Sequence, residues 1–136
     1  MAFLSDKKGE GFIDVAVFVI AASMFLVVCL SVFEFFMKKQ NLDYFAKEMI
    51  DAASSYGTVS GPVDERYEML CGQLGISPEC DFTGTEYFKK DLGTVQLGET
   101  IVIKLTLDLS VRLFGFLELP VTVTAVKSGF SQQYWK

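Results

Sequence analysis

Cys71 and Cys80 are the residues of this chain whose spacing could support covalent chemistry. The eight residues between them, GQLGISPE, leave the two thiols close enough in sequence to close a disulfide loop. Such a loop would contribute roughly 2–3 kcal/mol and would place the region in an oxidising compartment. The alternative is a pair of unlinked thiols. The third cysteine, Cys29, lies in an apolar run, where we expect it to pack against lipid or a neighbouring helix.

Asp14 is the other residue whose side chain could have a chemical role, as a carboxylate that pairs with a cation. It is the last charged residue before residues 15–33, VAVFVIAASMFLVVCLSVF, which carry no charge. A carboxylate at the boundary of a lipid bilayer is costly unless it is paired, so such residues are often functional. Two interpretations stay open: Asp14 pairs with a cationic group of another chain, or it extends to the lipid headgroups.

Most enzyme and cofactor chemistry is excluded by what the sequence lacks. It contains no histidine, so it offers no His-based catalytic triad and no imidazole metal ligand. Its three cysteines show no CxxC spacing, and no Gly-rich phosphate loop follows a predicted strand. The net charge of −5, without a basic run longer than Lys-Lys, argues against nucleic-acid binding. We therefore expect neither an enzyme nor a cofactor; a hydrolase built on carboxylates alone is the remaining enzymatic alternative.

Residues 15–33 predict a membrane-spanning helix. As a helix the run is about 28 Å long, close to the roughly 30 Å hydrocarbon core of a bilayer, and apolar flanks extend the span to 12–37. One alternative is a buried core helix, which so small a chain would struggle to cover on all faces. Another is a secretory signal cleaved at the small residues 21–23. Lysine pairs flank both ends of the span, so charge barely favours either orientation.

Two helices are predicted beyond the span. Residues 38–56 continue the first helix, with apolar positions that step by three and four residues. These positions are Leu42, Phe45, Met49, Ala52 and Tyr56. The segment GTVSGP ends that helix, and Pro62 suits the first turn of a short helix over 62–74.

The last third of the chain predicts a β-hairpin over 100–127. Apolar and polar residues alternate strictly over 101–113 and again over 117–125, with the turn Phe-Gly-Phe at 114–116. Pro120 indicates an edge strand, because proline lacks a main-chain donor. Residues 94–97 predict a third strand. A lone hairpin is seldom stable, so its apolar face should rest on the helix over 42–56. The tail with Trp135 should pack on the sheet, and partner binding is the alternative.

These elements predict an α+β fold: a long N-terminal helix, half transmembrane and half amphipathic, packed on a small antiparallel sheet with a C-terminal hairpin. The predicted divisions are a polar leader at 1–11, the transmembrane helix at 12–37 and an extracytoplasmic domain at 38–136. We expect a single-pass membrane protein with its C-terminal domain outside; the resemblance described next implies that the membrane is the bacterial cytoplasmic membrane.

The junction K-K-G-E-G-F-I-D before the apolar run resembles the N-terminus of type IV pilin-like proteins, and more closely that of TadE-like pseudopilins. In that pattern a short basic leader ends in glycine, and an acidic residue stands fifth in the mature chain. Gly9 would end the leader, Glu10 would become the first residue and Asp14 the fifth. Cleavage after Gly11 would instead make Phe12 the first residue. The chain is also similar to an uncharacterised family of small Gram-positive membrane proteins with a comparable Tyr-Trp-Lys tail.

This resemblance implies a structural subunit, a minor pseudopilin of a pilus, secretion or conjugation apparatus. Its partners would be the lipid bilayer, other pilin-like subunits or assembly machinery, and a prepilin peptidase. Asp14 would pair with the N-terminal amine of a neighbouring subunit. The alternative function is a single-pass, membrane-anchored binding module with an extracytoplasmic domain.

Overall fold

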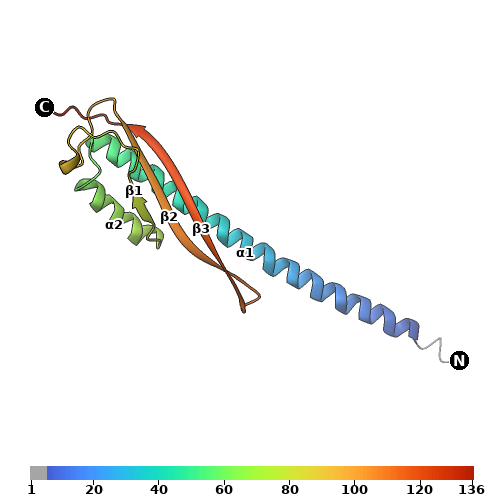
Figure 1. The fold of residues 1–136 in the computed structure, drawn as a ribbon. Helices are drawn as coiled ribbons and strands as arrows, with labels where there is room; N and C mark the ends of the chain where they lie inside the picture. Colours follow the sequence, from blue (N-terminus) through green and yellow to red (C-terminus); the bar gives the residue numbers. More distant parts are fainter. Residues whose placement is uncertain (1–5) are drawn as a thin grey trace. The chain divides into compact units, whose positions relative to one another are not determined.

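The computed structural model describes residues 6–136 and confirms the α+β fold (Figure 1). The elements in chain order are the helices α1 (Asp6–Tyr56) and α2 (Pro62–Leu74), the strand β1 (Glu79–Asp81), the 3-10 helix η2 (Lys90–Leu92), and the strands β2 (Thr100–Leu113) and β3 (Leu117–Phe130). They form two compact units. The first, called here the anchor unit, holds the described residues up to Phe36 together with Ser110–Leu119; the second, the head, holds Met37–Leu109 and Pro120–Lys136.

The segments predicted as a membrane helix over 12–37 and an amphipathic helix over 38–56 belong to a single helix, α1. Its sequence contains no proline, and no glycine between Gly11 and Gly57, so nothing in it breaks the main-chain hydrogen bonds. The helix also includes residues 6–11, for which the sequence predicted a polar leader. Residues 1–5 of that leader lie outside the described part of the chain.

The core of the head lies between α1, α2 and one face of the sheet. Its buried apolar side chains are Leu42, Phe45, Ala46, Met49, Ile50, Ala53, Val63, Leu70, Val95, Ile101, Ile103, Leu105, Val123 and Ala125. The expected stripe on α1 is correct at its start but wrong at its end, where Tyr56 is 53% exposed and Ala53 is buried instead. Tyr56 is the last residue of α1, and the chain turns directly after it at Gly57, which has a φ of +63°.

The sheet has the strand order β1-β2-β3, and β1 pairs with β2 in antiparallel orientation, with Cys80 opposite Leu105. The hairpin predicted over 100–127 is present as β2 and β3, and Pro120 lies on an edge strand as expected. The prediction of a third strand at 94–97 is wrong. Thr94 there makes only isolated bridges, to Thr58 and Lys89, and the third strand is β1.

A tight turn after α1 holds the C-terminal tail against the head. Gly57 has a φ of +63°, and a Cβ at this position would lie 2.5 Å from Cβ of Gln133, so only glycine fits. The indole Nε1 of Trp135 donates to the Gly57 carbonyl at 3.0 Å, and the main-chain N–H of Trp135 donates to Oε1 of Gln96 at 2.7 Å. The tail therefore packs on the head, while Tyr134 is 62% exposed.

Candidate functional site

The N-terminal part of α1 is the most apolar surface in the described chain. An 18-residue window of the helix has a mean hydropathy of 2.8, and none of it is buried. Phe18 and Phe25 are each 72% exposed. The buried-core alternative is therefore wrong, because no residue of this window is buried in the described part of the protein. A single membrane span and a signal sequence both fit the segment by length and composition.

The residues predicted to act at the N-terminus of this segment lie on α1. Asp14 is exposed and directly precedes the uncharged run. Gly9 is exposed, with open space around its Cα, and the side chain of Glu10 lies outside the described part. Leader cleavage beside Gly9 and the pairing of Asp14 with another subunit stay predictions.

Tyr67, Cys71 and Cys80 form a polar cluster between α2 and β1 in the head. Cys71 follows Tyr67 by one helical turn, and the Tyr67 hydroxyl donates to the carbonyl of Pro78 at 2.7 Å. The thiols of Cys71 and Cys80 are both half-buried and free. Burial raises the pKa of Cys80 to about 12, with added repulsion from Cys71 and then from Asp64. The electrostatic effect of Cys71 on Cys80 indicates that the thiols lie near each other, and their disulfide stays a prediction.

This cluster is poorly suited to nucleophilic catalysis. The thiolate is the reactive form of cysteine, and a raised pKa keeps Cys80 protonated at neutral pH. The Tyr67 hydroxyl is likewise held protonated, because desolvation and then its hydrogen bond with Cys71 raise its pKa to about 12. The described residues contain no group of three or more cysteine and acidic side chains that could hold a metal ion.

An open groove of about 420 Å³ lies between the head part of α1 and α2. Arg66 of α2 forms a salt bridge with Glu48 of α1 in its wall. The lining also includes two further carboxylates, Asp51 and Glu65, and the exposed side chain of Tyr56. The mixed charges and open form make this groove a surface depression in which no set of side chains converges on one point.

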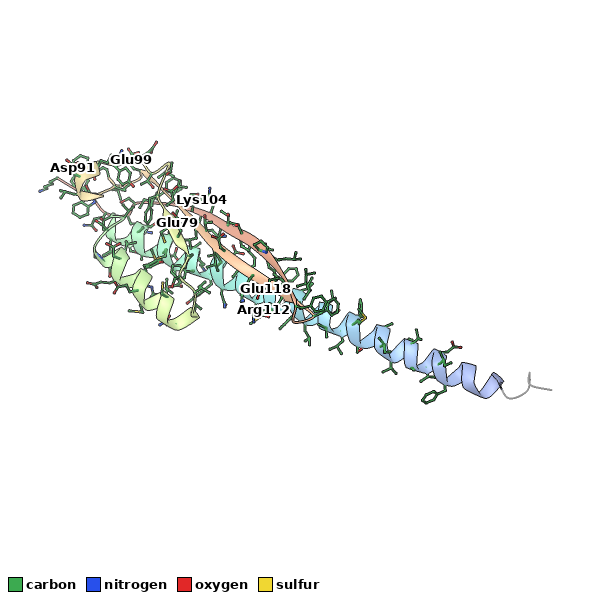
Figure 2. All side chains as sticks on the ribbon, turned by 60° about the horizontal axis from the view of Figure 1, so that its bottom comes forward. Glu79, Asp91, Glu99, Lys104, Arg112 and Glu118 are labelled. Carbon is green, nitrogen blue, oxygen red and sulfur yellow. The ribbon has the colours of Figure 1, made fainter. Side chains whose placement is uncertain are left out.

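Sequence reasoning predicted the turn between β2 and β3 but missed the contact of this region with α1. In the anchor unit the Ser31 hydroxyl lies within hydrogen-bond distance of two main-chain carbonyls, that of Val27 in its own helix at 3.1 Å and that of Arg112 in β2 at 3.2 Å. Arg112 and Glu118 face each other at the loop, with Nε and Oε1 2.5 Å apart (Figure 2). The signal in the sequence was the Phe-Gly-Phe turn, whose aromatic residues a solvent-exposed turn does not need.

Most of the chain matches one known protein family. Residues 19–136 match the DUF4320 family, which is described as a domain of unknown function. The match takes in most of the uncharged run and the whole head, whereas Gly9, Glu10 and Asp14 precede it. No curated protein and no solved structure matches the chain. The likeness to pilins therefore extends only to the architecture, an N-terminal apolar helix followed by a small antiparallel sheet, and the chain belongs to the DUF4320 family.

Proposed function

We propose that this protein is a pilin-like structural subunit, held in the membrane by the first part of α1 and able to assemble through that same helix. The head would be extracytoplasmic and would act by contact with other chains, without catalysis. The protein would serve a bacterial pilus, secretion or conjugation apparatus.

One observation carries this proposal: a long apolar helix segment with no buried part continues directly into the core helix of a folded head. Exposed apolar surface on this scale is too costly in water, so it must face lipid or the equivalent segments of other subunits. A pilin-like subunit uses both environments, first lipid and then a bundle of helices. The absence of a proline or internal glycine from Phe12 to Tyr56 suits a segment that must stay helical in both.

Asp14 would set the register of such a bundle. A carboxylate that pairs with the N-terminal amine of a neighbouring subunit forms a charge-assisted hydrogen bond, worth roughly 1.5–3 kcal/mol. Asp14→Ala should therefore reduce the assembled fraction by about 10- to 100-fold, since each 1.4 kcal/mol is tenfold. Asp14→Glu should preserve assembly, because the longer side chain keeps the carboxylate. Equal assembly of the wild type and Asp14→Ala would contradict this role.

The proposal is tested on full-length protein extracted from its native membrane. The mature N-terminus is determined by mass spectrometry, and the extract is run on native gels with identification of co-migrating chains. We expect a chain that begins at Glu10 or Phe12 and migrates with copies of itself or other pilin-like chains. An intact Met1 together with strictly monomeric protein would contradict the proposal.

A membrane-anchored binding module is the second candidate, and the extent of the family match favours it. The match begins at residue 19, so the junction that resembles a pilin leader is not among the matched residues. In this case α1 would stay in the bilayer and the leader would remain uncleaved. An intact Met1 and Asp14→Ala protein with unchanged behaviour in the membrane are the expected results.

A further inference from the structure

The loop that joins β2 and β3 carries an exposed apolar patch. The patch consists of the side chains Phe114, Phe116, Leu117 and Leu119. Phe116 is 83% exposed, and the rings of Phe114 and Phe116 stack with their centroids 6.3 Å apart. In the head, the apolar face of β2 and β3 is buried against α1. At the loop end of the hairpin, apolar and polar residues still alternate, but the apolar side chains are exposed.

The patch lies beside the last turns of the uncharged run of α1. The bond from the Ser31 hydroxyl to the Arg112 carbonyl joins the two segments, which belong to the same compact unit (Figure 1). Val28, Ser31 and Phe35 step by three and four residues and are half-buried, whereas the neighbouring faces of the helix are exposed. The hairpin end therefore covers one stripe of α1 that begins at Val28.

The position of this stripe fixes how far the loop reaches along the apolar segment. The uncharged run ends at Phe33, so Ser31 lies about 3 Å and Val28 about 8 Å inside its end, at 1.5 Å per residue. An apolar surface that lies at the membrane interface is typically buried by about 5–10 Å at the boundary of headgroups and acyl chains. The patch is thus at a depth where lipid can cover it.

The charges beside the patch fit the same placement. Arg112 and Glu118 form a salt bridge, and their side chains are 72% and 53% exposed. They are the charged side chains between residues 109 and 119, so one charged residue lies on each side of the loop and the residues between them are uncharged. A guanidinium group can bind lipid phosphate with two parallel hydrogen bonds, which suits Arg112 to the headgroup layer.

We propose that the patch Phe114, Phe116, Leu117 and Leu119 inserts into the lipid boundary beside α1 and gives the protein a second contact with the same leaflet. This inference rests on the membrane location given under the proposed function. It adds that the hairpin end is a lipid-binding element in its own right. The lipid contact would help to fix the depth and rotation of the apolar helix, whose uncharged run is apolar on every face.

Tryptophan quenching by brominated lipid tests the proposal on the full-length protein in phosphatidylcholine–phosphatidylglycerol vesicles. Three variants are compared: Phe116→Trp in the patch, Phe130→Trp as a matched control on an exposed phenylalanine of the head, and Phe25→Trp at the middle of the uncharged run. The wild type gives the background from Trp135. Melting curves of each variant in the same vesicles verify that the head remains folded.

The depth of the bromine in the acyl chain separates the three variants. Bromine near the headgroup end should quench the Phe116→Trp variant at least about twofold more strongly than the Phe130→Trp variant, as expected for an interfacial residue. Bromine near the methyl end should quench the Phe25→Trp variant most.

Three results would overturn the proposal. If the Phe25→Trp variant is quenched and the patch variant behaves like the head control, the membrane location holds but the patch does not contact lipid. If the Phe25→Trp variant is not quenched either, the membrane location itself fails, and the proposal with it. Protection of the patch tryptophan only in assembled subunits, without lipid quenching, would identify a protein contact instead.

Discussion

The two parts of α1 differ in what covers them, although the helix is continuous. In the head, Leu42, Phe45 and Met49 are almost fully buried in the core, and charged residues occupy the other faces. In the anchor unit the helix is apolar all round, and Phe18 and Phe25 are each 72% exposed. A helix in a folded domain needs one apolar stripe, whereas a helix that meets lipid or other helices needs apolar residues on every face. The two parts of this one helix therefore suit two different environments.

The largest expected difference between the two parts of α1 is the loss of stability when one phenylalanine in each part is replaced by alanine. Phe45 is fully buried, and its ring packs edge-on against the ring of Tyr67 with the two ring centroids 5.4 Å apart. Phe45→Ala should therefore lower the free energy of unfolding by about 3–5 kcal/mol. Phe25→Ala should change it by less than about 0.5 kcal/mol, because Phe25 is not part of the head core. Thermal melting of the two variants in the same detergent measures both values. Equal losses in the free energy of unfolding would contradict the difference in burial between the two parts of α1.

An arginine introduced into each part of α1 should affect membrane insertion differently. Leu26→Arg places a guanidinium near the centre of the uncharged run, which should make membrane insertion less favourable by about 3 kcal/mol. Tyr44→Arg, on an exposed face of the head part, should leave insertion unchanged. The apparent free energy of insertion follows from the inserted fraction in a membrane-vesicle assay. An unaffected Leu26→Arg protein would contradict contact between this segment and lipid.

Glycines in the two units should also respond differently. Gly57→Ala should destabilise the head by about 1–3 kcal/mol, because φ is +63° there and the new Cβ would overlap Gln133. Gly11→Ala meets open space on α1 and should leave the melting temperature of the head unchanged. Melting of both variants by near-UV circular dichroism provides the measurement. A Gly57→Ala protein as stable as the wild type would require a different turn after α1.

The smallest effect concerns the pH dependence of the head. Burial raises the pKa of the Cys80 thiol from 9.0 to about 12, and desolvation raises that of Tyr67 from 10.0 to about 12. The folded state therefore retains protons that the unfolded state releases, so stability is full below pH 9 and falls as the pH rises toward 12. Denaturant titrations between about pH 8 and pH 11 should show this fall, and Cys80→Ala should flatten it. An unchanged slope in Cys80→Ala would contradict the raised pKa of the thiol.

The parts of the fold that the sequence predicted are those with long periodic patterns. The uncharged run, the continuation of α1 and the alternation in β2 and β3 each extend over about ten or more residues, so they stand out from local variation. β1 has three residues, too few to show a period, and it pairs only because the chain brings Cys80 opposite Leu105. Tyr56 was misplaced because it is the last residue of α1, where the chain turns and the helical repeat no longer decides which side chain is covered.

The candidate site was predictable only where one element defines it. The apolar segment is visible from composition alone, and so is the position of Asp14 at its start. The contact between Ser31 and Arg112 joins residues 81 positions apart, so no local pattern could show it. Val28 and Phe35 are half-buried in the same unit as the hairpin end, and their sequence pattern does not distinguish them from the exposed residues of the run.

The edge position of β3 bears on the assembly proposed above. A 14-residue strand at a sheet edge can act as a template for unwanted pairing and aggregation. Pro120 removes one amide donor from this strand, Lys127 places a charge on it, and the ammonium group of Lys39 occupies the Thr124 carbonyl at 2.9 Å. These three features make the strand a poor partner for another β-strand. In the assembly proposed above, copies would therefore meet through the helix and not through the sheet edge.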